Sequence, residues 1–174
     1  MKIALCQINT TVGDFDNNCE KILSFYSNSV DANADIAVFP ELAITGYPPQ
    51  DLLLEQSFVD RNVQELEALT SVVDDVPMVV GYVQPIGKNL YNSAALLQNG
   101  KISGRYDKVL LPTYDVFDED RYFTAGESRS PLKAKIGKET IFLGVEICED
   151  MWDEDYSSKI TDELVNAGAQ MILN

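Results

Sequence analysis

The stretch DIAVFPEL, residues 35–42, is a short apolar run that Pro40 stops and that contains one carboxylate, Glu41. A run of this length and composition is typical of a buried strand. Residues 16–33 before it carry apolar side chains at the spacing of one helical face, and so do residues 59–73 after it. A buried strand between two amphipathic helices predicts an α/β layered domain.

Apolar runs elsewhere in the chain extend this alternation. We expect further strands at residues 2–8, 77–85, 140–148 and 169–174, and a third helix at residues 156–167. Two more segments, residues 90–97 and 101–111, flank Asn99-Gly100, and Asn-Gly is the strongest short hairpin signal. The hairpin makes the predicted sheet mixed rather than purely parallel. Residues 112–126 combine aromatic and acidic side chains without a period, which predicts a structured loop.

Composition limits the size and the partners of the protein. The 174 residues are 45% hydrophobic, which is enough for one core, so we expect one domain over residues 1–174. The formal net charge of −15 argues against nucleic acid and anionic membranes as partners, because these attract basic surfaces. No segment approaches the ~18 apolar residues of a membrane span, so we expect a soluble protein.

The three cysteines, Cys6, Cys19 and Cys148, are far apart and odd in number. They fit neither a disulfide framework nor a paired-cysteine metal site, so we expect no metal and a reducing, cytoplasmic location. The chain stops at the end of a predicted core strand, which is an unusual place for a natural terminus. We therefore expect a domain that is truncated at its C-terminus.

Three predicted strand ends carry reactive side chains, namely Glu41, Lys108 and Cys148. Ligands gather at strand ends in open α/β sheets. A cysteine nucleophile here needs a partner other than imidazole, because the chain contains no histidine. We expect Glu41 to act as general base, and Lys108 to favour the thiolate and to donate to an oxyanion. The backbone N–H of Glu149 is a second candidate donor.

Each of these residues also has a simpler explanation. A cysteine that closes an apolar strand is more often a core thiol than a nucleophile, and a lysine near a strand end is usually solvated. Glu41 is harder to explain in this way, because a carboxylate at the end of a buried strand seldom stays unpaired. On residue pattern alone, the chain is an α/β domain with a candidate Cys–Glu–Lys site.

Three motifs carry a family resemblance. FPELAITGYPPQDLL, GRYDKVLLPTYDVFDEDRYFTAG and GVEICEDMW occur in this order, at residues 39–53, 104–126 and 144–152. Together they resemble the nitrilase superfamily of carbon–nitrogen hydrolases and, more narrowly, the N-terminal glutaminase domains of glutamine-dependent NAD synthetases. The resemblance covers the whole chain. It implies a four-layer α-β-β-α sandwich with mixed sheets that associates into homo-oligomers.

The family's catalytic glutamate, lysine and cysteine fall on Glu41, Lys108 and Cys148. The resemblance also implies a pocket for L-glutamine, formed by Tyr47, Tyr114, Phe117 and Glu149. Glu149 is expected to contact the α-amino end of the substrate. The implied activity is the release of ammonia from glutamine through a cysteine thioester. The ammonia would serve the ATP-dependent amidation of deamido-NAD to NAD.

The synthetase half of such an enzyme has no counterpart in these residues, since no GxxxxGK or SGGxDS-type stretch occurs. The resemblance places ATP and Mg²⁺ in that half and implies no cofactor for residues 1–174. It also places two further glutamine-binding residues, a serine and a basic residue, just beyond residue 174. Two alternatives stay open: a free-standing nitrilase-type amidase that acts on another amide, and a non-catalytic assembly module. A thiol redox sensor is disfavoured, because no resolving cysteine lies near Cys148 in sequence.

Overall fold

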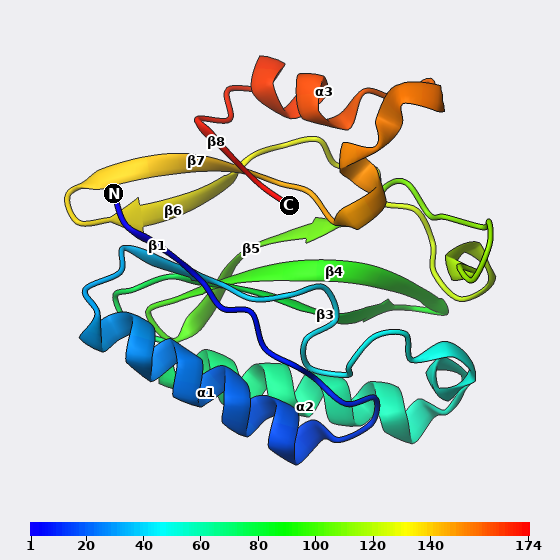
Figure 1. Cartoon of the computed structure of the whole chain (residues 1–174), viewed down its shortest axis with the longest axis horizontal. Coiled ribbons are helices and arrows are strands. Elements are labelled where there is room, and N and C mark those ends of the chain that lie inside the picture. Colours follow the sequence, from blue (N-terminus) through cyan, green and yellow to red (C-terminus); the bar gives the residue numbers. More distant parts are fainter.

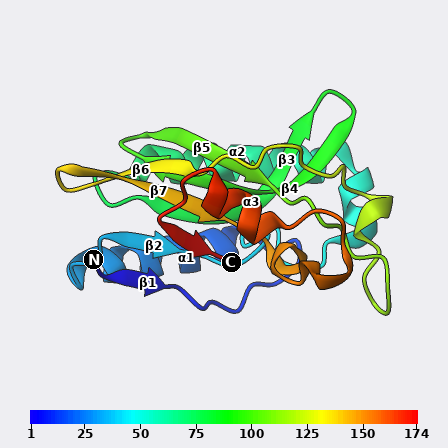
Figure 2. The ribbon, with the colours of Figure 1, turned by 90° about the horizontal axis from the view of Figure 1, so that it is seen from above.

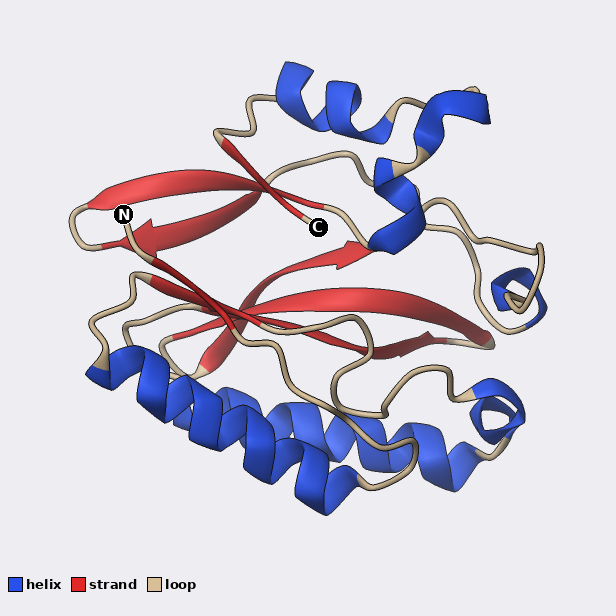
Figure 3. Ribbon diagram, in the orientation of Figure 1, coloured by secondary structure: helices blue, strands red, loops and turns tan.

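Two β-sheets lie face to face between layers of helices in the computed structural model, which describes all residues 1–174 (Figures 1 and 3). The first sheet has the strand order β1 (Ile3–Leu5), β2 (Ile36–Val38), β3 (Met78–Ile86), β4 (Asn89–Gln98) and β5 (Lys101–Asp107). The second has the order β6 (Leu132–Ile136), β7 (Glu139–Val145) and β8 (Met171–Leu173). Helices α1 (Phe15–Asp31) and α2 (Gln56–Val72) cover the first sheet, and α3 (Ile160–Asn166) covers the second. The predicted four-layer α-β-β-α sandwich is confirmed.

The first sheet is mixed, as the sequence predicts. Strands β1, β2 and β3 run parallel, because α1 and α2 form the crossovers between them. Strands β3, β4 and β5 are antiparallel neighbours. Asn99 and Gly100 form the tight turn between β4 and β5 with φ angles of 53° and 69°, the left-handed conformation that makes Asn-Gly a hairpin signal.

The central strands of the first sheet, β3 and β4, are buried on both faces, and successive side chains of a strand point to opposite sides. Met78 and Val80 of β3 pack in the core below α1 and α2. Val79, between them, packs with β4 residues such as Leu96 against the second sheet. This second core includes Leu143 of β7 and joins the two sheets.

Three predictions about elements need correction. The strand predicted at residues 2–8 is shorter and is not buried: β1 lies at the sheet edge, and Ile3 and Leu5 are 36% and 72% exposed (Figure 2). The sequence does not predict strand β6. In its five residues, LKAKI, exposed lysines alternate with apolar residues, so the segment resembles a charged loop. The third helix begins at Ile160 rather than at residue 156. The Asp153 carboxylate accepts the N–H of Ile160, the first residue of the helix, at 2.8 Å.

None of the helices combines the length and the apolar composition that crossing a membrane requires.

Candidate active site

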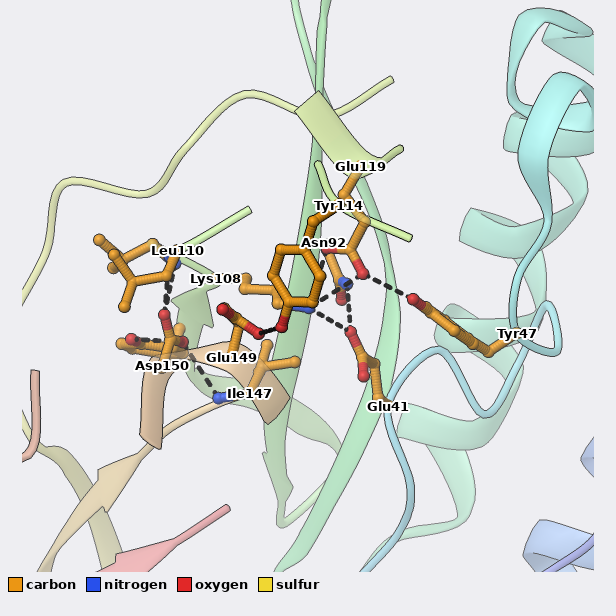
Figure 4. A network of polar contacts seen from close by, with 12 residues as sticks. Glu41, Tyr47, Asn92, Lys108, Leu110, Tyr114, Glu119, Ile147, Glu149 and Asp150 are labelled. Carbon is orange, nitrogen blue, oxygen red and sulfur yellow. Dashed lines mark hydrogen bonds and ion pairs between the residues drawn. The ribbon is translucent and has the colours of Figure 1, made fainter. Parts of the chain in front are cut away.

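The three reactive side chains that the sequence singles out follow three different strands. Glu41 follows β2, Lys108 follows β5, and Cys148 follows β7. The strands belong to both sheets, and their ends meet at one side of the sandwich (Figures 1 and 4). Glu41 and Cys148 line the same small cavity of about 80 Å³ between the sheets. The structure therefore brings these chain-distant residues together.

Lys108 lies at the centre of a buried ion-pair cluster. Its side chain is fully buried, and its Nζ lies 2.9 Å from Oε1 of Glu41 and 2.8 Å from Oε2 of Glu119. The Asn92 amide also donates to Oε1 of Glu41 at 2.7 Å, and the Tyr47 hydroxyl donates to Glu119 at 2.9 Å (Figure 4). The ammonium is thus held between two carboxylates that are themselves fixed by neutral donors.

Two glycines let the backbone approach the site closely. A Cβ atom on Gly81 of β3 would lie 2.3–2.8 Å from the backbone of Pro40, Glu41 and Leu42, so only glycine allows the turn that carries Glu41 to lie against β3. A Cβ atom on Gly126 would meet the backbone of Asp107, next to Lys108, at 2.1 Å.

The nucleophile candidate sits at a sharp turn. Cys148 follows β7 and begins a 3₁₀ turn (Cys148–Met151) with φ of +49°, a left-handed conformation that is uncommon for a non-glycine residue. Asp150 holds this turn: its Oδ2 accepts the Ile147 N–H at 3.1 Å, and the Asp150 N–H donates back to the Ile147 carbonyl at 3.2 Å. The strained backbone at Cys148 is therefore held on both sides.

Asp150 also connects the Cys148 turn to the segment that follows Lys108. Its Oδ1 accepts the backbone N–H groups of Val109 and Leu110 at 3.1 and 2.8 Å (Figure 4). Its Oδ2 accepts the Tyr106 hydroxyl at 2.9 Å. One fully buried carboxylate thus holds the two segments that present the thiol and the ammonium.

The electrostatics of the cluster differ in part from the sequence-based expectation. Burial alone would lower the pKa of Lys108, but Glu41 and Glu119 outweigh it and raise that pKa. Burial raises the pKa of the Cys148 thiol, and Glu41 raises it further, whereas Lys108 lowers it. Lys108 does act in the predicted direction, yet two carboxylates cancel its charge. Burial and the carboxylates therefore favour the protonated form of the thiol.

The residues implied for a glutamine pocket lie around this cluster in two adjoining hollows. Tyr47 and Phe117 line one of about 420 Å³. Tyr114 and Glu149 line a more open one of about 590 Å³. The rings of Tyr114 and Phe117 connect the two through an edge-to-face contact with centroids 5.7 Å apart.

Sequence reasoning misses Glu119, Asn92 and Asp150 as members of the site. Glu119 lies among several acids of one loop, and no local pattern distinguishes it from them. Asn92 lies inside β4, and nothing in the sequence distinguishes its amide from that of an ordinary polar residue on a strand. Asp150 lies two residues after Cys148, and nothing local in the sequence shows that its carboxylate reaches Val109 and Leu110.

The family of the chain follows from comparison with known proteins. A model of the family described as carbon–nitrogen hydrolase matches residues 2–174. The chain belongs to the carbon–nitrogen hydrolase family. Glu41, Lys108 and Cys148 are candidate catalytic residues of this carbon–nitrogen hydrolase domain.

Among the relatives of this carbon–nitrogen hydrolase domain is a glutamine-dependent NAD(+) synthetase from Synechocystis sp., 37% identical over 99% of the chain. The same enzyme from Thermotoga maritima is 40% identical over 88% of the chain. The chain spans 33% and 26% of the lengths of these two relatives.

Solved structures agree with the fold. A glutamine-dependent NAD+ synthetase from Acinetobacter baumannii superimposes with a TM-score of 0.86 at 34% identity, over 98% of this chain and 31% of that one. An amidase from Nesterenkonia sp. superimposes with a TM-score of 0.78 at 24% identity, over 99% of this chain and 63% of that one. The amidase shares the layered sandwich alone.

Proposed function

We propose that this chain is the glutaminase part of a glutamine-dependent NAD synthetase. The observation that carries the proposal is the meeting of Glu41, Lys108 and Cys148 at the ends of strands from two sheets. The names of relatives 37–40% identical support glutamine as the substrate. The alternative of a free-standing amidase rests on fold likeness alone, because the amidase neighbour is 24% identical.

The proposed reaction begins with a protonated thiol, in keeping with the raised pKa of Cys148. Glu41 accepts the thiol proton while Sγ of Cys148 attacks the side-chain amide carbon of glutamine. The oxyanion that forms accepts hydrogen bonds from Nζ of Lys108 and from the backbone N–H of Glu149. When the intermediate collapses, the C–N bond breaks, and ammonia leaves with the proton that Glu41 returns.

Water completes the cycle. Glu41, now ionised again, accepts a proton from water, whose oxygen attacks the carbonyl carbon of the γ-glutamyl thioester. The C–S bond breaks, glutamate leaves, and the sulfur regains a proton from Glu41. Glu41 gains and loses a proton in both halves of the reaction, so its carboxylate must stay in one place. Its contacts to Lys108 and Asn92 hold it there.

The wider setting is part of the same proposal. The ammonia passes to a synthetase domain, which holds ATP and Mg²⁺ and amidates deamido-NAD to NAD. All three cysteines are unpaired, which favours the reducing cytoplasm as location. We also propose that the protein acts as a homo-oligomer, as the family resemblance implies.

The test compares ammonia sources in the complete protein. Cys148→Ala is expected to abolish glutamine-dependent NAD synthesis and to spare synthesis from added ammonia. Cys19→Ala removes a buried thiol of α1 whose pKa is raised to about 12 by burial, and it is expected to retain both activities. Loss of both activities in Cys148→Ala would contradict the assignment. Faster release of ammonia from simple aliphatic amides than from glutamine would favour the amidase alternative.

A further inference from the structure

Two tyrosine hydroxyls hold the two oxygens of one buried carboxylate beside the nucleophile. Tyr114 donates to Oε2 of Glu149 at 2.8 Å, and Tyr156 donates to Oε1 at 2.9 Å. We propose that Tyr156 is a positioning residue that fixes the Glu149 carboxylate for recognition of the substrate's α-ammonium group. The inference rests on the proposed glutaminase function and adds a residue that selects for amino-acid amides.

The hydrogen-bond capacity of Glu149 supports this role. Glu149 is only 5% exposed. A carboxylate accepts about four hydrogen bonds. The two tyrosines use one position on each oxygen, which leaves further positions for an ammonium donor. Held at both oxygens, the carboxylate cannot rotate, so its free lone pairs keep one direction. Bonds of this kind, with one charged partner, are stronger than neutral ones.

The two tyrosines are not equivalent. Tyr114 lies on the loop after β5 and is 53% exposed. Tyr156 packs against the core that joins the two sheets, and its backbone N–H donates to the Asp153 carbonyl at 3.1 Å. Asp153 in turn accepts the first N–H of α3. Tyr156 is therefore the more rigid donor, attached to the helical layer, and it sets the orientation of Glu149.

The adjoining hollow has the chemistry of a cation site. Glu149, Tyr114 and Tyr156 line it together with Trp152, Glu154 and Asp155. Carboxylates and aromatic faces both attract ammonium groups. No lysine or arginine lines this hollow; the nearby Lys159 ammonium donates to the backbone carbonyls of Asp153 and Glu154, so the carboxylates of the lining keep their charge toward the hollow. The surroundings favour a substrate with a positive charge near its amide over a neutral amide.

Removal of the Tyr156 hydroxyl gives the decisive test. Tyr156→Phe keeps the packed ring but frees Oε1 of Glu149, and it leaves Glu41, Lys108 and Cys148 unchanged. We expect kcat/KM for glutamine to fall about tenfold or more, through KM, because a hydrogen bond to a charged group is lost. Glutaramate, which is glutamine without its α-amino group, provides the comparison. Its kcat/KM is expected to stay within about twofold.

The control removes a tyrosine hydroxyl far from the site. Tyr26 lies on α1, where its hydroxyl donates to the Val76 carbonyl at 2.7 Å, and Tyr26→Phe is expected to change neither substrate's kinetics. An equal loss on glutamine and glutaramate in Tyr156→Phe, or no loss on either, would overturn the inference. A merely structural role for Tyr156 predicts the equal loss.

Binding measurements separate this inference from the proposed function. In a Cys148→Ala background, which cannot form the thioester, calorimetry gives the affinities for glutamine and glutaramate with and without Tyr156→Phe. Weaker binding of glutamine alone supports the role of Tyr156 even if the wild-type protein does not hydrolyse glutamine. Equal affinities for the two ligands in the presence of Tyr156 would refute the ammonium site itself.

Discussion

Nζ of Lys108 lies 2.8 Å from Oε2 of Glu119, and both side chains are buried. This contact joins a strand end to an acidic loop eleven residues further along the chain. With Glu41 on the other side, the ammonium faces two carboxylates. Burial and Glu41 together therefore hold the pKa of Cys148 above its ordinary value despite the nearby cation.

Neutralising Glu119 is expected to make the thiol more acidic. Glu119→Gln removes one of the negative charges that raise the pKa of Cys148 and keeps a side chain of the same size. The pH profile of Cys148 alkylation by iodoacetamide should therefore move to lower pH. A profile that stays in place or moves to higher pH would show that Glu119 does not act on the thiol electrostatically.

Removing the ammonium is expected to damage both activity and stability. Lys108→Met leaves Glu41 and Glu119 close together without a cation, and breaking a buried ion pair in this way costs about 3–5 kcal/mol. Loss of an oxyanion donor lowers kcat by roughly 10²–10³. Urea unfolding and glutaminase rates measure the two effects. Lys101→Met, at an exposed position at the start of β5, is the matched control and should change neither.

The Asp150 carboxylate is expected to contribute strongly to stability. The two carboxylate oxygens of Asp150 accept four hydrogen bonds. Asp150→Asn keeps the shape of the side chain but leaves only one oxygen that can accept them. Each lost bond to a charged group costs about 1.5–3 kcal/mol, so the free energy of unfolding should fall by about 3 kcal/mol or more. Asp155→Asn, an exposed neighbour, should change it by less than about 0.5 kcal/mol. Equal urea midpoints for the two variants would contradict the anchoring role.

Glu146 is expected to make stability depend on pH. Both of its carboxylate oxygens are buried without a hydrogen-bond partner. Burial raises its pKa, the nearby Thr161 hydroxyl favours the charged form without completing a hydrogen bond, and Asp150 and Asp153 raise the pKa further. The folded protein therefore holds this proton more tightly than the unfolded chain does. Stability from this group is present below the unfolded pKa and is lost as pH rises through the folded pKa.

Glu146→Gln should consequently stabilise the protein at pH 8, by about 1 kcal/mol or more, and much less at pH 4.5. Urea midpoints at the two pH values provide the measurement. The same substitution at Glu139, an exposed residue of β7, is the control and should have little effect at either pH. Destabilisation by Glu146→Gln at pH 8 would mean that the carboxylate has a favourable partner in the folded protein.

Local patterns were sufficient for the layers and for the candidate residues. The alternation of apolar strands and amphipathic helices predicts the α/β layers, and Asn99-Gly100 predicts the hairpin of β4 and β5, as the structure confirms. Glu41 and Cys148 stand out because each follows an apolar run, and Lys108 stands out because it directly precedes one, Val109–Leu111. These features depend on neighbours within a few residues, which is the range over which backbone periodicity and turn chemistry act.

What the tertiary structure alone decided is which of these groups meet and with what net charge. Nothing near Glu119 in the sequence shows that it faces Lys108, and nothing near Tyr156 shows that it holds Glu149. Such contacts exist because the two sheets pack face to face and so bring together turns that are remote in the sequence. The state of the thiol is a sum of burial and several charges over short distances in space, so its sign emerges only once every contributor has its place.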